Sequence, residues 1–162
     1  MTQNGFLPWT RSCFVCGEAN PQGLRQRSRL EDGRVLLDFT PAEEHVGYQH
    51  LVHGGLGMTL LDEVMTWAAI MAAGRVCVAA EMATRFVQPM RVGEPLCAVG
   101  WVTESKRRLI LTTGELTDTA GQVLLRATGK YVPRPAEETA LCADDFVRDP
   151  AAIPLARIFA PT

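Results

Sequence analysis

Four polar side chains lie along one long apolar segment in the middle of the chain. Most positions in 56–73 are apolar, and the polar exceptions follow the helical spacing i, i+3, i+4 and i+7: Thr59, Asp62, Glu63 and Thr66. Side chains at these spacings share one side of a helix. The stripe is therefore either the solvated edge of a buried helix or a carboxylate aimed into a cleft, where it could act as a general base or a nucleophile.

The sequence His53-Gly54-Gly55 leads into this segment. Glycine lets a backbone approach a ligand closely, and the first turn of a helix presents unpaired N–H groups at the positive end of its dipole. Donors of this kind can bind a carbonyl oxygen that becomes negative during acyl transfer. The glycines also fit the simpler interpretation of a turn before a helix.

Gly55 and Asp62 are too far apart on one helix to act on the same carbonyl group. They are seven residues apart in the sequence, which is about 10 Å along a helix that rises ~1.5 Å per residue. Reacting groups must lie within about 3–3.5 Å of each other. If both residues act, they come from different chains, and we expect a two-fold dimer that pairs Gly55 of one subunit with Asp62 of the other.

The elements that must position these residues follow from the pattern of apolar, glycine and proline residues. The segment 54–73 is expected to be one helix, ended by Gly74. Residues 31–33 have turn chemistry between two short strands, and 118–121 form a turn between the last two of four longer ones. The predicted strands are 24–30, 34–39, 76–88, 96–104, 109–117 and 123–132. Their short links favour antiparallel pairing, so we expect an α+β domain with the helix on one sheet face.

The remaining segments complete a single predicted domain over 1–162. We expect residues 1–22 to be an irregular leader and 42–52 to be a loop. The tail, 134–162, is proline-rich, and it forms either a short helix near 140–147 or a loosely packed segment.

Composition narrows the class of protein. Lys plus Arg is 16 and Asp plus Glu is 18, for a net charge of −2, so a nucleic-acid partner held by phosphate contacts is not expected. The apolar run 64–73 is shorter than the ~20 residues of a membrane span. The N-terminus shows no apolar signal with a cleavage site, so we expect a cytoplasmic protein whose five cysteines are reduced.

Three motifs resemble one family. The helix motif VHGGLGMTLLDEVMTWAA (52–69) resembles the hotdog-fold acyl-CoA thioesterases of the phenylacetyl-CoA thioesterase-like branch, in which Asp or Glu follows nine residues after the His. His53 and Asp62 have this spacing. The segments RFVQPMRVGE (85–94) and CFVCGEANPQGLR (13–25) are similar to the third strand and the leader of that branch. The resemblance runs from about residue 13 to 132.

The resemblance implies a hotdog fold, an antiparallel sheet of about six strands wrapped around one long central helix. It also implies an acyl-CoA substrate, no cofactor and no metal. Members of the family form homodimers by joining their sheets edge to edge, often as dimers of dimers, and their sites lie between two subunits. This arrangement agrees with the distance between Gly55 and Asp62.

The resemblance assigns roles to individual residues. The Gly55 N–H would polarise the thioester carbonyl, Asp62 would be the general base or the nucleophile, and His53 would shape the turn or contact the carbonyl. Further substrate contacts are expected at Gly54, Glu63, Thr66, Ala79 and His50, with Arg91 and Arg107 as phosphate contacts. The chain departs from the family at Ala79, where Ser or Thr is common, and at Gly47, where Asn or Gln is common.

Other candidate residues have simpler interpretations. Glu63 is interpreted as a residue behind the site or at a subunit interface, with the main carboxylate as the alternative role. Trp67 is interpreted as a packing residue, with a wall of the acyl pocket as the alternative. Cys13 and Cys16 are interpreted as a structural knuckle, with half a zinc site or redox chemistry as alternatives. Cys77 and Cys97 lie in apolar strands and are expected in the core.

Two other functions compete with thioester hydrolysis. Hotdog proteins also hydrate enoyl thioesters, but that chemistry pairs a His with a carboxylate in a different motif. A non-catalytic acyl-CoA-binding module is suggested by Ala79. The acyl group is not specified, although an apolar pocket for aryl or medium-chain groups is indicated by Met58, Met65, Trp67 and Met90.

Overall fold

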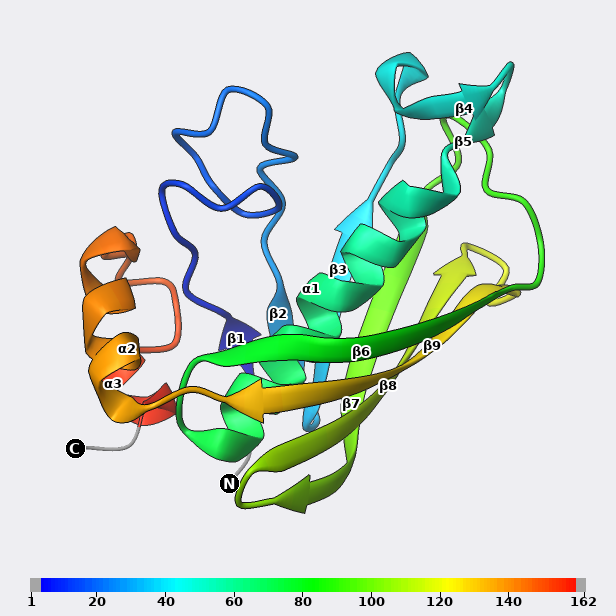
Figure 1. Ribbon diagram of the computed structural model, residues 1–162. Helices are drawn as coiled ribbons and strands as arrows, with labels where there is room; N and C mark the ends of the chain where they lie inside the picture. The colour runs from blue at the N-terminus through cyan, green and yellow to red at the C-terminus, as the bar shows by residue number, and fades with distance from the viewer. Residues whose placement is uncertain (1–3, 160–162) are drawn as a thin grey trace.

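A computed structural model describes residues 4–159. Figure 1 shows one antiparallel sheet that curves around the long helix α1 (Gly54–Ala73). The sheet has seven strands in the order β1-β2-β3-β7-β8-β9-β6. The strands are β1 (Gly5–Phe6), β2 (Arg29–Glu31), β3 (Arg34–Phe39), β6 (Cys77–Phe86), β7 (Leu96–Lys106), β8 (Leu109–Asp118) and β9 (Val123–Pro133). The predicted hotdog fold is confirmed, with seven strands instead of about six.

Helix α1 has the bounds that the sequence predicts. The His53 side chain accepts a hydrogen bond at its start, and Gly74 ends it with φ 65° and an N–H bonded to the Ile70 carbonyl. Only a residue without a side chain adopts this left-handed conformation freely. By length and composition α1 could cross a membrane. In the fold, however, its apolar side chains pack against the sheet, as those of a core helix do.

The core lies between α1 and the concave face of the sheet. Alternate residues of β8 and β9, such as Leu116 and Leu125, are buried against it. Gly100 on β7 lets the helix come close, because a Cβ there would lie 2.7 Å from the Val64 backbone. The position of α1 is therefore fixed by close contact with the sheet.

Two segments differ from the prediction because tertiary contacts decide their structure. The predicted strand 24–30 is a strand only at its end, in β2. Upstream, Leu24 and Gln26 donate backbone hydrogen bonds to Phe14 and Val15 of the leader instead. The predicted loop 42–52 contains the short helix η1 (Glu43–His45) and a hairpin of β4 (Val46–Tyr48) and β5 (Leu51–Val52), which lies beyond the first turn of α1 (Figure 1).

The tail is folded onto the rest of the chain. It forms α2 (Ala136–Cys142), η2 (Ala143–Asp145) and α3 (Leu155–Ile158), so the helix starts earlier than the predicted 140–147. The Phe146 ring packs edge-on against Trp67 of α1, with 6.2 Å between ring centroids. Phe6 in the leader forms a bridge with Ala152. Leader and tail thus cover one end of the core together.

Candidate active site

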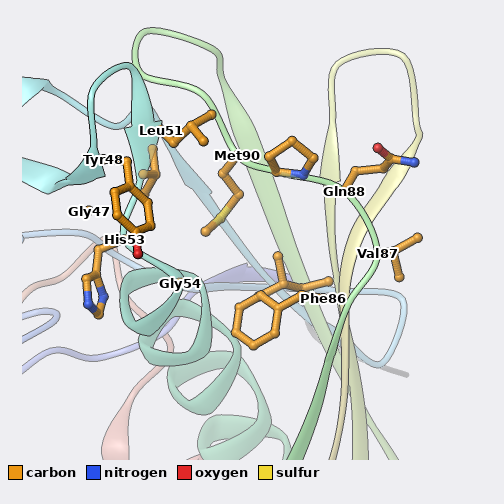
Figure 2. Close-up of a pocket in the computed structure, with 12 residues that line it drawn as sticks. Gly47, Tyr48, Leu51, His53, Gly54, Phe86, Val87, Gln88 and Met90 are labelled. Atoms are coloured by element: carbon orange, nitrogen blue, oxygen red, sulfur yellow. The ribbon is translucent and has the colours of Figure 1, made fainter.

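A cavity of about 440 Å³ opens at the first turn of α1. Its wall is mainly apolar and comes from the β4–β5 hairpin, the end of β6 and the segment after it. Figure 2 shows Tyr48, Phe86 and Met90 around the helix start. Gly54 lies at the edge of the Phe86 ring, since a Cβ at Gly54 would be 2.8 Å from a ring carbon. The predicted substrate contact at Gly54 therefore lies in a cavity that suits an apolar group.

His53 caps the helix beside this cavity. Its Nδ1 accepts a hydrogen bond from the Gly55 N–H at 3.0 Å, while its own backbone N–H donates to the His45 carbonyl. The predicted turn-shaping role of His53 is thus visible in the fold. The Gly55 N–H, however, already has a partner within the chain. A substrate carbonyl can take this donor only after the imidazole of His53 turns away.

Three further predicted contacts, His50, Arg91 and Arg107, lie at opposite ends of α1. His50 has φ 64° in the turn between β4 and β5, and Arg91 bridges to Leu51 of the same hairpin. Arg107 instead lines a cleft of about 170 Å³ near the C-terminal end of the helix, together with Arg75 and Lys106. One chain therefore does not bring the two candidate phosphate contacts, Arg91 and Arg107, together.

Asp62 lies two turns along α1, half-buried against β9. Its Oδ1 accepts a hydrogen bond of 2.7 Å from the Tyr131 hydroxyl and one of 3.5 Å from Thr66. Ala79 on β6 is directly opposite Tyr131 in the sheet register. Of the predicted residues, Asp62 and Thr66 are therefore in contact, and Ala79 is connected to them only through its strand pairing with Tyr131. Tyr131 completes the group and was not among the predicted site residues, although a tyrosine at an inward strand position needs a partner for its hydroxyl.

Glu63 faces a different environment from its neighbour Asp62. Its Oε1 accepts a hydrogen bond from Trp67 Nε1 at 3.2 Å, and it also hydrogen-bonds to the Cys16 thiol. Burial, helped by the negative charge on Cys13, raises the pKa of Glu63 to about 8. Glu63 is therefore mainly an uncharged acid at neutral pH, packed under the leader. The two carboxyl groups of the polar stripe, Asp62 and Glu63, therefore have different surroundings.

Trp67, Cys16 and Cys77 are buried, whereas Cys97, which is predicted to lie in the core, is only partly buried. Trp67 is buried against the tail and does not line the cavity at the start of α1, which agrees with its interpretation as a packing residue. Cys13 and Cys16 hydrogen-bond through their side chains, which lowers the pKa of Cys13 to about 6 and raises that of Cys16. Within residues 4–159, no three His, Cys, Asp or Glu side chains are placed to hold a metal ion.

Known proteins are similar to this chain in sequence. Residues 49–125 match the family described as the thioesterase superfamily. Acyl-coenzyme A thioesterase 13 of Homo sapiens is 29% identical over 101 residues, which are 62% of this chain and 67% of the human protein. The protein of the same name from Pongo abelii matches to the same extent.

Solved structures agree on the fold. The crystal structure of a thioesterase superfamily protein superposes with a TM-score of 0.67 at 29% identity, over 75% of this chain and 63% of that one. A Streptococcus mutans protein bound to acetyl CoA gives a TM-score of 0.61 at 20% identity, over 65% of this chain and 84% of its own. The helix motif, the curved sheet and the sequence match therefore agree that this chain is similar to the thioesterase superfamily over residues 49–125.

Proposed function

We propose that this protein hydrolyses acyl-CoA thioesters to a free acid and CoA. The observation that carries the proposal is the placement of Asp62, a carboxylate on the central helix with one oxygen held by the Tyr131 hydroxyl. The superfamily match and a relative named as an acyl-CoA thioesterase support a thioester as substrate. The CoA portion is supported by the acetyl CoA bound to the Streptococcus mutans protein.

The proposed site lies between two subunits. The Gly55 N–H and Asp62 are about 10 Å apart along α1, too far to reach one carbonyl. Strand β6 ends the sheet, and within residues 4–159 its outer edge pairs with no other strand. Exposed apolar side chains occur along this strand and just after it, at Val78, Phe86 and Val87. A long edge of this kind favours pairing with a second copy, which would bring Asp62 near the helix start of its partner.

The chemistry then needs two groups on one thioester. An N–H at the first turn of α1 holds the carbonyl oxygen while negative charge builds up on it. The Asp62 carboxylate of the other subunit either takes a proton from water, which attacks the carbonyl carbon, or attacks that carbon itself. The bond from carbon to sulfur breaks, and the CoA sulfur leaves and takes up a proton. If Asp62 is the nucleophile, water then hydrolyses the acyl-aspartyl anhydride.

The surroundings of this site suit the two ends of an acyl-CoA. The cavity beside the helix start is mainly apolar, so we assign it to the acyl group or the adjoining pantetheine arm. The basic cleft of Arg75, Lys106 and Arg107 lies at the other end of α1, where we expect it to attract phosphates. We expect Arg91 to be a second cation beside the β4–β5 hairpin. Both assignments depend on the dimer.

A thiol-release assay with aryl-, short- and medium-chain acyl-CoAs tests this proposal. We expect release from at least one class, and a loss of about 100-fold or more in Asp62→Asn, which keeps the shape but removes the carboxylate. Tight acyl-CoA binding with no thiol release by the wild type would instead support a binding module. Loss of enoyl absorbance without thiol release would support a hydratase, and either result would refute hydrolysis.

A further inference from the structure

The hydroxyl of Tyr131 forms a hydrogen bond with Asp62. Tyr131 is completely buried, yet its hydroxyl donates a 2.7 Å hydrogen bond to Asp62 Oδ1 from a strand 69 residues away in sequence. Thr66, one helical turn from Asp62, is the weaker donor at 3.5 Å. Because both donors approach the same oxygen, Asp62 Oδ2 is left for another partner.

The strand pairing shows why a tyrosine can fill this place. Ala79 on β6 lies opposite Tyr131 on β9 and brings only a methyl group to the sheet face. Gly129, two residues before Tyr131, leaves room for the ring, since a Cβ there would lie 2.5 Å from a ring carbon of Tyr131. Two small residues, Ala79 and Gly129, therefore lie beside Tyr131, while Ile110 of β8 lies opposite it on the other side.

We propose that Tyr131 is the positioning residue for the Asp62 carboxylate. This inference rests on the proposed function. Tyr131 holds Oδ1, so that Oδ2 is presented to the attacking water or to the thioester carbon. It acts through Asp62 and does not itself contact the substrate.

The electrostatics of the pair agree with this role. Burial and the negative charge of Asp62 raise the pKa of Tyr131 above its usual range, so its hydroxyl keeps its proton and remains a donor. The other titratable group beside Asp62 is Glu63 on the same helix, and the facing residue of β6, Ala79, carries no charge. A neutral donor to a carboxylate stabilises the charged form, in which Asp62 can act as a base.

The variant Tyr131→Phe removes this hydroxyl and keeps the ring. We expect kcat to fall by about 10- to 100-fold with KM within about twofold of the wild type. A fall in kcat at nearly constant KM indicates a defect in the chemical step and not a general loss of the binding site. A kcat within twofold of the wild type would overturn the proposal.

A second variant separates positioning from packing. Thr112→Val removes another buried hydroxyl near Gly129, one with no hydrogen-bond partner among residues 4–159, and we expect it to keep wild-type kinetics. A loss of kcat in Thr112→Val equal to that in Tyr131→Phe would refute the assigned role.

The carboxyl NMR signal of Asp62 distinguishes failure of this inference from failure of the proposed function. If the wild type releases no thiol, hydrolysis is refuted, but the signal can still be compared between wild type and Tyr131→Phe at one pH. We expect the Asp62 carboxyl signal to shift in the variant, because the hydrogen bond from the Tyr131 hydroxyl is removed. An unchanged signal would refute the positioning role, whether or not the wild type is active.

Discussion

At the scale of single residues, two adjacent carboxyl groups on α1 have different chemistry because their partners differ. Asp62 is half-buried and receives hydrogen bonds from Tyr131 and Thr66. Glu63 is turned under the leader, where burial keeps its proton on at neutral pH. A protonated acid cannot take a proton from water. The difference favours Asp62 as the acting carboxylate, although the sequence places both residues in the same stripe.

The variant Glu63→Gln tests whether Glu63 is protonated, through the pH dependence of the unfolding free energy. The pKa of Glu63 is raised from 4.5 to about 8 in the folded state. Between these values the folded protein binds more protons than the unfolded chain, so this group makes stability fall as pH rises. Glutamine cannot titrate, so the unfolding free energy of the variant rises relative to that of the wild type as pH increases.

We expect the difference in unfolding free energy between Glu63→Gln and wild type to change by on the order of 3 kcal/mol from about pH 5 to about pH 9. Urea unfolding at a series of pH values measures it. A difference that stays constant over this range would contradict a protonated Glu63. The wild type itself serves as the reference at every pH, so other titrating groups largely cancel.

At the scale of elements, the bounds of helices and strands could be predicted where the signals lie within a few residues of each other. Helix α1 has its predicted bounds because His53 and Gly74 mark its ends locally. The four long strands also lie where the apolar alternation predicts them. By contrast, the β4–β5 hairpin, the shortened strand at β2 and the helix α2 depend on partners distant in sequence, such as the leader carbonyls that bind Leu24 and Gln26.

The difference between local signals and distant contacts also explains which features of the site could be predicted from the sequence. Asp62 could be singled out from its spacing to His53. Tyr131 could not be paired with it, because the contact joins α1 to β9 across 69 residues. The occupied Gly55 N–H was also not predictable, since it depends on the rotamer of His53.

The helix cap offers a test at this scale. In His53→Ala, the Gly55 N–H loses its side-chain acceptor, and we expect about 1 kcal/mol of lost stability, a usual cost of removing a cap. His53→Asn is the matched control, because asparagine is a good cap and should retain most of the stability. Urea unfolding compares the three proteins. Equal losses in both variants would show that the imidazole stabilises the fold by other contacts.

At the scale of the whole molecule, we propose that the dimer has two sites and that each chain contributes one half of each. Each half would come from a different part of the helix, Gly55 from its start and Asp62 from its middle. The apolar content of the chain then serves both the core around α1 and an interface along β6. In such a dimer, the activity that remains when the two subunits carry different inactivating substitutions differs from that expected for two independent subunits.

Two inactive variants should therefore restore each other in a mixed dimer. Asp62→Asn removes the carboxylate, and Gly55→Pro removes the backbone N–H at a helix position where proline is tolerated. In a dimer with one subunit of each kind, one site carries both defects and the other carries neither. With two affinity tags to isolate mixed dimers, we expect about half of the wild-type thiol release, whereas each variant alone is inactive.

The controls separate shared sites from simple folding effects. Gly55→Ala keeps the N–H and adds a methyl group that meets only the movable His53 ring, so it should retain activity where Gly55→Pro does not. Circular dichroism checks that every variant is folded. If both groups acted within one subunit, every site of the mixed dimer would carry one defect and no activity would return. Restored activity therefore requires that Gly55 and Asp62 meet across the interface, because no other arrangement leaves an intact site.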